Sequence, residues 1–274
     1  MIIIADSGST KCSWTAISSE GIERVRTRGI NAVQHSEPFI GAILAELPAW
    51  DNVEQVWFYG AGCGAHFPKA QHMMEQLLAK RFRGAEVHAE SDLTGAARAL
   101  FGRGDGIACI LGTGSNSCYC KGGEVIENVP PLGYILGDEG SGAVLGRNLL
   151  NGIFKGYIPL HRELETEMGL SYEELIRRIY REPGANRFLG SLAPFILRHI
   201  NCAPLGEMVK ESFREFARRN LRRYPAGKKV AAIGSIALHF EGLLRDALRE
   251  EGFTLDRVVA SPDEGLINFH RNNG

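Results

Sequence analysis

The sequence has no long hydrophobic run and no excess of charge of either sign. No apolar run approaches the ~20 residues that a membrane-spanning helix needs, and the chain starts with a strand-like segment instead of a basic leader and a cleavage site. Its 31 basic and 32 acidic side chains give a formal net charge of -1, so no general attraction draws the surface to nucleic acid or to an anionic membrane. We therefore expect a cytoplasmic protein with no nucleic acid or membrane partner, in which any phosphate site is local.

The sequence also lacks the cysteine and histidine spacings of metal sites. Its six cysteines form no C-x-x-C pair, and its eight histidines form no H-E-x-x-H motif. Most of the cysteines lie in apolar, strand-like stretches, as reduced core thiols do. We expect no disulfide and no structural zinc. With 274 residues and 44% hydrophobic residues, the chain can bury the core of one large or two ordinary domains.

The most informative stretch is the first one, which reads IIIADSGSTKCSW. It predicts a strand over Ile2–Ile4, a tight turn that carries Asp6, and a second strand over Cys12–Ile17. A turn of small residues leaves backbone N–H groups free to bind a phosphate, and the carboxylate can hold a hydrated Mg²⁺ beside it. Taken alone, the same stretch favours an ordinary hairpin, because short turns of Gly, Ser and Asp between strands are common.

The second half of the sequence repeats this pattern. Gly106–Tyr119 reads GIACILGTGSNSCY, again a strand, a turn of small residues and a strand. A third strand follows each copy, over Ile22–Arg26 and Val125–Asn128. Because strand, turn and strand recur about a hundred residues apart, we infer an internal duplication with two phosphate-type turns that face a shared cleft.

Helices and strands alternate in the remainder of the first half, and the second half becomes helical. Periodic apolar residues predict helices over Glu37–Leu47, about Lys69–Phe82 and the ESDLTGAARALFG segment, with strands over Val53–Tyr59 and Glu86–Ala89 between them. From about 155 to 224 the pattern is helical and charged, with arginines on a solvated face. A strand over Val230–Ile233, a Gly-Ser turn and a helix over Leu238–Leu248 follow.

Four polar positions allow two interpretations each. Asn31 can bind a ligand or shape its turn. Asp138 and Asp92 each precede a helical pattern, where a carboxylate can cap the helix or act on a ligand. The Gly234–Ser235 turn brings the backbone close to a ligand such as an adenine ring, or only packs a helix on the sheet.

In this order and spacing, the motifs resemble those of the N-acetylglucosamine kinase-like and BadF-BadG-BcrA-BcrD ATPase family, within the sugar kinase, Hsp70 and actin superfamily. The matching segments are Asp-x-Gly-x-Thr at Asp6–Thr10, GTGSN at Gly112–Asn116, GDEGS at Gly137–Ser141 and the late Gly-Ser turn. The resemblance runs from Asp6 to about Leu248. It implies an α/β fold of two RNase H-like (actin-like ATPase) domains, each with a mixed five-stranded sheet, and an interdomain cleft for nucleotide and sugar. The expected domains are 1–104 and 105–274, with a helical insertion at about 155–225 and an extreme C-terminus able to pack back on the N-terminal domain.

The resemblance also implies roles for single residues. Asp6 would hold the Mg²⁺ of Mg-ATP through water, and Asp92 would be the catalytic carboxylate beside the sugar. Contacts to ATP and its phosphates would come from Gly8, Ser9, Thr10, Lys11, Thr113, Gly114, Gly234, Ser235 and His239. Further contacts to the sugar would come from Asn31, Ser115, Asn116, Gly133 and Asp138.

The sequence departs from the family pattern at two places. Ser7 directly follows the acid, where these kinases usually have the first of two adjacent glycines, and this narrows the backbone conformations open to the turn. Pro131, Leu132 and Gly133 stand where related eukaryotic sugar kinases have Gly-Trp-Gly, so an aromatic wall of the sugar site is absent.

We predict an ATP-dependent kinase that phosphorylates the 6-hydroxyl of N-acetylglucosamine or a relative such as glucosamine or N-acetylmuramic acid. Its partners would be the sugar and ATP, with a homodimer as the candidate oligomer because related proteins are often dimers. One alternative is a BadF-type ATPase activator of a radical acyl-CoA dehydratase or reductase, which would need a cysteine near the GDEGSG segment for its [4Fe-4S] cluster. The other is a sugar-sensing ATPase of the repressor type, and we expect no DNA-binding domain because the first strand follows Met1 directly.

Overall fold

The computed structural model describes residues 1–8 and 10–271, which form two compact units. Unit 1 contains Met1–Arg103, the tip Gly122–Glu124 of a hairpin, and the chain from Pro262 on. Unit 2 contains Gly104–Lys121 and Val125–Ser261. Unit 1 is therefore completed by two short pieces from the second half of the sequence.

Unit 1 is built on a mixed five-stranded sheet in the order β3-β2-β1-β4-β5. β1 pairs antiparallel with β2 and parallel with β4, β2 pairs antiparallel with β3, and β4 pairs parallel with β5. The strands are β1 (Ile2–Ser7), β2 (Lys11–Ser18), β3 (Gly21–Arg28), β4 (Gln55–Gly60) and β5 (Glu86–Glu90). The helices are α1 (Glu37–Ala45), α2 (Pro68–Arg81), α3 (Asp92–Phe101) and α13 (Asp263–Arg271).

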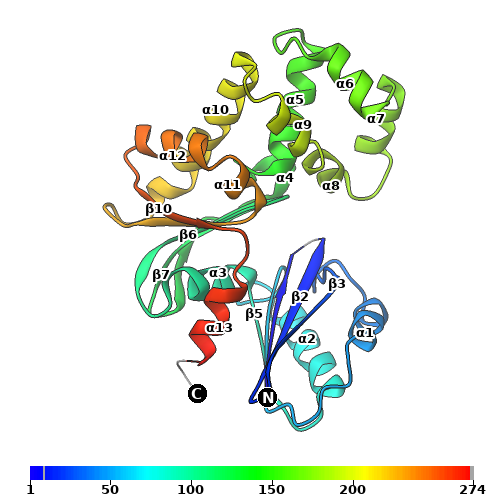
Figure 1. Ribbon diagram of the computed structural model, residues 1–274, viewed down its shortest axis with the longest axis vertical. Helices are drawn as coiled ribbons and strands as arrows, with labels where there is room; N and C mark the ends of the chain where they lie inside the picture. Colours follow the sequence, from blue (N-terminus) through cyan, green and yellow to red (C-terminus); the bar gives the residue numbers. More distant parts are fainter. Residues whose placement is uncertain (9, 272–274) are drawn as a thin grey trace. The chain divides into compact units, whose positions relative to one another are not determined.

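Two pairs of helices cover the two faces of this sheet (Figure 1). Successive strand residues point to opposite faces, and Ile3 belongs to the apolar cluster formed with α1 and α2, while Ile4 belongs to the cluster formed with α13. Both residues are buried, as are Tyr59 and Leu266 in the second cluster. The almost continuous apolar run of β1 is thus explained by helices on both sides.

Unit 2 repeats this sheet topology. Its strand order is β10-β9-β6-β7-β8, with β6 antiparallel to β7, and with β6, β9 and β10 parallel to one another. The strands are β6 (Asp105–Leu111), β7 (Ser115–Lys121), β8 (Glu124–Asn128), β9 (Val230–Ile233) and β10 (Leu255–Val259). The predicted fold class, an α/β protein with two mixed five-stranded sheets, is confirmed.

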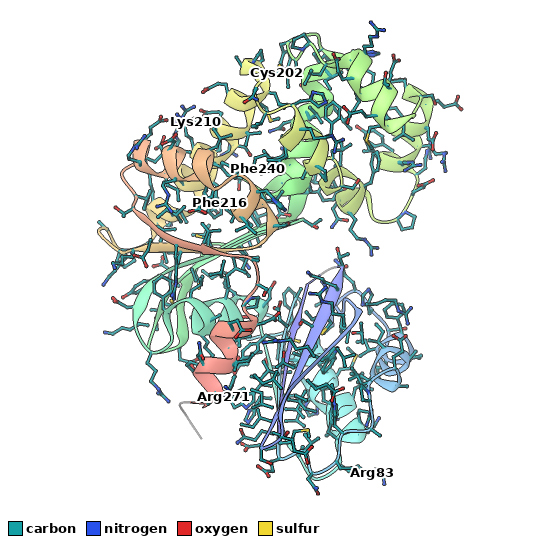
Figure 2. All side chains as sticks on the ribbon, in the orientation of Figure 1. Arg83, Cys202, Lys210, Phe216, Phe240 and Arg271 are labelled. Carbon is teal, nitrogen blue, oxygen red and sulfur yellow. The ribbon has the colours of Figure 1, made fainter. Side chains whose placement is uncertain are left out.

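The helices of unit 2 pack around one large apolar core. Phe216 from α10 and Phe240, which precedes α12, lie inside it (Figure 2). The predicted arginine face is on the outside of α10, where Arg218 and Arg219 are exposed and pair with glutamates. The helices are α4 (Gly133–Leu136), α5 (Gly142–Phe154), α6 (His161–Met168), α7 (Tyr172–Tyr180), α8 (Ala185–Gly190), α9 (Ala193–Arg198), α10 (Ala203–Arg219), α11 (Ser235–His239) and α12 (Glu241–Glu250), with a 3₁₀ turn at Leu221–Arg223.

Three features differ from the expectations or were not among them. The helix expected over Leu238–Leu248 is two helices, because Phe240 leaves the helical conformation and places its ring in the core. β10 and α13 had not been predicted. The six cysteines are all free, as expected, and none of the described helices is long and apolar enough to cross a membrane.

Helix α13 lies so close to α3 that only glycine fits at their crossing. A Cβ atom on Gly265 would lie 2.3 Å from the carbonyl oxygen of Ala99, and another backbone atom of Ala99 would lie 2.7 Å away. Real Cβ atoms do not approach backbone so closely, so the two helices would have to separate. Gly265 therefore sets the distance between α13 and α3.

We predict that Gly265→Ala destabilises the protein by about 1–3 kcal/mol, because the overpacked crossing must open. The matched control is Gly242→Ala in α12, where an added Cβ would meet no atom within 4 Å. That change should stabilise by about 0.5–1 kcal/mol, since alanine is the better helix former. Urea unfolding midpoints measure both effects, and equal shifts in the two variants would contradict the close crossing.

Candidate functional site

The first small-residue turn lies in unit 1, between β1 and β2. Asp6 is the last but one residue of β1, and the amide of Gly8 donates to the carbonyl of Lys11 at 3.1 Å, which closes the turn. Gly8, Thr10 and Lys11 are exposed, whereas Ser9 lies outside the described residues. The turn therefore presents its backbone to solvent directly beside an acidic residue.

Asp6 lies among other carboxylates. Burial, together with the negative charges of Asp263 and Asp92, raises the pKa of Asp6 to about 7, although Lys11 opposes this shift. A carboxylate in such surroundings is stabilised by a nearby cation. The position of Asp6 thus fits the cation role implied by the resemblance.

Asp92 is the first residue of α3 and directly follows β5. The capping residue of this helix is Ser91, whose hydroxyl accepts a hydrogen bond from the amide of Thr94 at 3.0 Å. The capping interpretation of Asp92 is therefore wrong, and its carboxylate is not engaged as the N-cap. Burial raises the pKa of Asp92, while the amides of Leu93 and of Asp92 itself donate to the carboxylate and oppose the shift.

Asn31 lies in the loop after β3 and shapes its own turn. Its side-chain oxygen accepts hydrogen bonds from the amides of Val33 at 3.0 Å and Gln34 at 3.2 Å. Within the described structure its side-chain nitrogen has no partner, so Asn31 keeps a donor for a ligand. The two interpretations of Asn31 are therefore compatible.

The second small-residue turn joins β6 and β7 in unit 2. The amides of Gly142 and Ala143, at the start of α5, donate to the carbonyls of Gly112 and Thr113 at 2.8 and 3.0 Å. The N–H groups of Thr113 and Gly114, by contrast, donate to no backbone carbonyl in the described structure. The turn is thus fixed through its carbonyls and keeps donors for an anion.

Asp138 packs directly on this turn. Its carboxylate accepts a hydrogen bond from the amide of Ser115, and a Cβ on Gly114 would lie 3.1 Å from it. Burial, with a contribution from Glu139, raises the pKa of Asp138 to about 6 despite that hydrogen bond. The N-cap of α5 is Ser141, so the capping interpretation of Asp138 is wrong.

The side chains of Ser115 and Asn116 are used within unit 2. The hydroxyl of Ser115 donates to the carbonyl of Glu139 at 2.8 Å. The side-chain oxygen of Asn116 accepts from the amide of Ser117 and from the side chain of Asn128. Like that of Asn31, the side-chain nitrogen of Asn116 has no hydrogen-bond partner in the part of the chain that the structure describes.

Gly133 lies in an exposed loop that leads to Asp138. Leu132 and Gly133 both have positive φ angles, of 61° and 73°, and the amide of Asp138 donates to the carbonyl of Pro131 at 2.9 Å, which closes the loop. The side chains of Leu132, Ile135 and Leu136 are at least 63% exposed. This exposed loop therefore presents apolar side chains to solvent.

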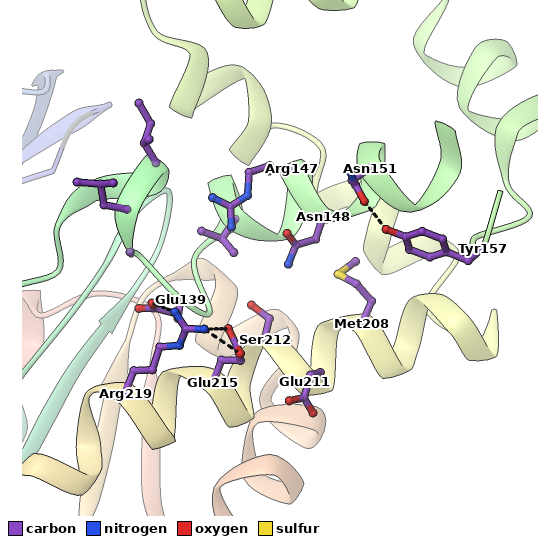
Figure 3. Close-up of a pocket in the computed structure, with 14 residues that line it drawn as sticks. Glu139, Arg147, Asn148, Asn151, Tyr157, Met208, Glu211, Ser212, Glu215 and Arg219 are labelled. Carbon is purple, nitrogen blue, oxygen red and sulfur yellow. Dashed lines mark hydrogen bonds and ion pairs between the residues drawn. The ribbon is translucent and has the colours of Figure 1, made fainter. Parts of the chain in front are cut away.

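A polar pocket of about 430 Å³ lies behind this loop, between α4, α5 and α10 (Figure 3). On one side, Arg147 donates to the carbonyl of Tyr134 at 2.7 Å. On the other, Arg219 lies 3.4 Å from the carboxylate of Glu139 and also pairs with Glu215. These contacts fix both ends of the segment that carries Asp138.

The late Gly-Ser turn joins β9 to the short helix α11. Gly234 has a φ of 120°, and a Cβ there would lie 2.3 Å from the carbonyl oxygen of Leu111, so the turn needs glycine for packing. Ser235 and His239 are exposed on α11. The packing interpretation therefore holds for Gly234. The side chains of Ser235 and His239 remain accessible to a ligand.

Comparison with solved structures identifies the family. The chain is 42% identical to a provisionally named N-acetylglucosamine kinase from Porphyromonas gingivalis, in a match that covers 100% of this chain and 99% of that one, with a TM-score of 0.95. The chain belongs to the N-acetylglucosamine kinase-like family. A scan against protein-family models and a search of curated proteins find no match.

More distant sugar kinases share the fold of this N-acetylglucosamine kinase-like chain. A second provisionally named N-acetylglucosamine kinase, from Chromobacterium violaceum, is 19% identical, with 98% of each chain covered and a TM-score of 0.71. A ROK family glucokinase from Streptomyces griseus, solved with glucose and AMPPNP, is 18% identical, with 100% and 99% covered and a TM-score of 0.57. None of these matches singles out the BadF-type ATPases.

A buried arginine that sequence reasoning missed holds the helix of Asp92. Arg98 on α3 is 7% exposed and donates to the hydroxyl of Tyr59, the carbonyl of Gly123 and the carboxylate of Glu124 at 2.9, 3.1 and 2.9 Å. The hydroxyl of Tyr59 in turn lies 2.8 Å from Nε2 of His270 on α13. We call these residues the Arg98 cluster, which joins α3, β4, α13 and the hairpin tip.

The Arg98 cluster contains a histidine that stays neutral. His270 is 5% exposed, and burial lowers its pKa to about 4, with Arg98 and His88 adding to the shift. In the unfolded chain a histidine has a pKa of about 6.5. The unfolded state therefore binds a proton between pH 6.5 and 4 that the folded state does not.

We predict that the wild-type protein loses stability as the pH falls through this window, because His270 contributes its full stability only above pH 6.5. The loss should reach on the order of 3 kcal/mol at pH 4. The control is His270→Gln, which retains a hydrogen-bonding side chain beside Tyr59 but cannot titrate. Urea unfolding at pH 7 and pH 4.5 measures both proteins, and the same pH dependence in the two would rule out His270 as the cause.

Proposed function

We propose that this chain is an ATP-dependent kinase that transfers phosphate to the 6-hydroxyl of N-acetylglucosamine or a related hexosamine, with Asp92 as the general base. The observation that carries the proposal is a half-buried carboxylate at the start of α3, which is not the helix cap and whose pKa is raised by burial. The likeness to the Porphyromonas gingivalis protein, which covers the whole chain, supports the choice of sugar.

In phosphoryl transfer the protein mainly positions the reactants and neutralises charge, and it forms no covalent bond to them. The sugar oxygen forms a bond to the γ-phosphorus, the bond to ADP breaks, and the hydroxyl proton passes to the carboxylate of Asp92. Because burial raises the pKa of Asp92, the carboxylate is a stronger base than an exposed aspartate. A base at this position contributes about 10²–10⁴-fold to the rate.

Phosphate and metal binding are assigned to the small-residue turns. Gly8, Thr10 and Lys11, with Ser9, would contact the phosphates from unit 1, and Thr113 and Gly114 would do so from unit 2. Asp6, which lies among other carboxylates, would hold the Mg²⁺ of Mg-ATP through water. When bound with ATP, the ion supplies charge neutralisation at the phosphates.

The sugar and the adenine are assigned to the remaining residues. Asn31 and Asn116 each keep a side-chain donor, while Asp138 supplies a carboxylate acceptor and Gly133 an exposed backbone. Ser115 would act through its backbone, since its hydroxyl is bonded to Glu139. Gly234, Ser235 and His239 would line the adenine. We further propose a cytoplasmic enzyme and a homodimer, as in related proteins.

The alternative function as an activator with an iron-sulfur cluster is disfavoured by the cysteines. Such a cluster, shared between subunits, needs accessible thiolates. Five of the six cysteines are buried, and Cys202, which is half-buried, precedes α10 and is remote in sequence from the GDEGSG segment. The kinase is therefore the function that we favour.

We predict sugar-dependent ADP release when the protein is given Mg-ATP and a panel of amino sugars. N-acetylglucosamine, glucosamine and N-acetylmuramic acid form the panel, with glucose as the comparison sugar. Phosphorus NMR of the product should show a 6-phosphate ester. If no hexosamine stimulates turnover, the proposed function is wrong.

We predict that Asp92→Asn lowers kcat by about 10²–10⁴-fold with little change in nucleotide affinity, because the amide cannot accept the proton. The control is Asp51→Asn, which removes an exposed carboxylate before β4. Steady-state kinetics and ADP titration measure the two effects. A variant at position 92 that turns over at the wild-type rate would show that another group is the base.

A further inference from the structure

Ser7 is buried directly beside Asp6, and besides its contact with the side chain of Cys12 its hydroxyl bonds to both backbone polar groups of one distant residue. Its side chain is 0% exposed. The hydroxyl donates to the carbonyl of Ile30 at 3.0 Å and accepts from the amide of Ile30 at 2.8 Å. One serine hydroxyl thus satisfies both backbone polar groups of a buried residue 23 positions away.

Other backbone hydrogen bonds attach the same loop to its surroundings. The amide of Gly29 donates to the carbonyl of Thr10 in the phosphate turn at 3.2 Å. Beyond Ile30, the amide of Ala32 donates to the carbonyl of Ala61, whose own amide donates to the carbonyl of Ser7. The loop that starts at Gly29 is therefore attached to β1, to the phosphate turn and to the residue after β4.

Asn31 follows Ile30 directly, so its position depends on these attachments. Its side-chain oxygen is held by the turn that it forms, and a Cβ on Gly62 would lie 2.7 Å from that oxygen. The free side-chain nitrogen is thereby held in one place. Removing the Ser7 hydroxyl would release the residue next to Asn31 while leaving Asn31 itself unchanged.

We propose that Ser7 is a positioning residue, which holds the loop of Asn31 at a fixed distance from the phosphate turn of unit 1. This role rests on the proposed function, in which Asn31 donates to the sugar and the turn binds phosphate. A glycine at position 7 cannot make these bonds, so the serine is a functional departure from the two-glycine turn. Its loss should weaken sugar binding and leave ATP binding unchanged.

If Ser7 only stabilised the fold, its replacement would have a different effect on the kinetics. Unfilled hydrogen bonds in the core would lower stability and the amount of active protein, and would change both Michaelis constants alike or neither. A positioning serine acts on the loop of Asn31, because Ile30 loses its partners whereas the turn keeps its own Gly8 to Lys11 hydrogen bond. The separation of the two Michaelis constants is therefore the decisive quantity.

The test compares Ser7→Ala and Ser7→Thr with the wild type, in steady-state assays with N-acetylglucosamine and Mg-ATP. Ser7→Ala should raise KM for the sugar about 10-fold, as expected for the loss of one good hydrogen bond, with KM for ATP changed less than about 2-fold. Ser7→Thr keeps the hydroxyl and should restore most of the sugar affinity. The control Thr15→Val removes another buried hydroxyl, on β2, and should leave both constants unchanged.

An unchanged sugar KM in Ser7→Ala, or an equal rise in both constants, would overturn the positioning role. If Ser7→Ala does not fold, amide hydrogen exchange of the wild-type protein tests the role instead. The amide of Ile30 should exchange as slowly as the amides of the core strands. Fast exchange at Ile30 would overturn the positioning role. If the wild-type protein shows no sugar-stimulated turnover, the proposed function itself is wrong. If the wild-type protein turns over normally and Ser7→Ala has an unchanged sugar KM, only the proposed role of Ser7 is wrong.

Discussion

The close packing of α3 between β4 and α13 is the constraint on which unit 1 depends. Glycine at two positions allows it, since a Cβ on Gly95 would lie 2.9 Å from the side chain of Tyr59 and a Cβ on Gly265 would meet Ala99. The buried guanidinium of Arg98 is surrounded by this packing and bonds to Tyr59 and to the hairpin tip. Steric contact sets the depth of the helix, and the charged hydrogen bonds of the arginine fix its rotation. Asp92, at the start of the same helix, is held by both.

The two units share the same arrangement of strands and turn, but the aspartate beside the turn has different surroundings in each. Each places a turn of small residues between two antiparallel strands and an aspartate nearby. In unit 1 the aspartate belongs to the strand itself and lies among other acids, while in unit 2 Asp138 arrives on a separate loop and accepts from the turn. The pKa of both groups is raised, because each carboxylate is taken out of water. The same strand and turn arrangement therefore carries an aspartate in two different electrostatic environments.

The sheets and their turns could be predicted because they depend on local periodicity and on repetition. The apolar run of β1, the small-residue turns and the position of Asp92 after a strand are all visible within a few residues. The capping of α3 and α5 was assigned to the wrong residue, since serine and aspartate are both good caps and only geometry chooses between them. The Arg98 cluster could not be predicted, because its contact between Tyr59 and His270 spans 211 positions. For the same reason the hydroxyl of Ser7 gave no sign of its partner.

The membership of α13 in unit 1 affects how the protein can be made. Ile4, Ile17 and Tyr59 on one face of the first sheet are covered by Leu266 and Ile267 of that helix. Ribosomes deliver a chain from its N-terminus at about 5–20 residues per second, so α3 can pack on this face early, whereas the part under Leu266 and Ile267 stays uncovered until the segment from Pro262 on has emerged. Unit 1 begins first in synthesis and is completed last. The part of the sheet face that α13 covers is therefore exposed in every nascent chain that has not yet passed Pro262.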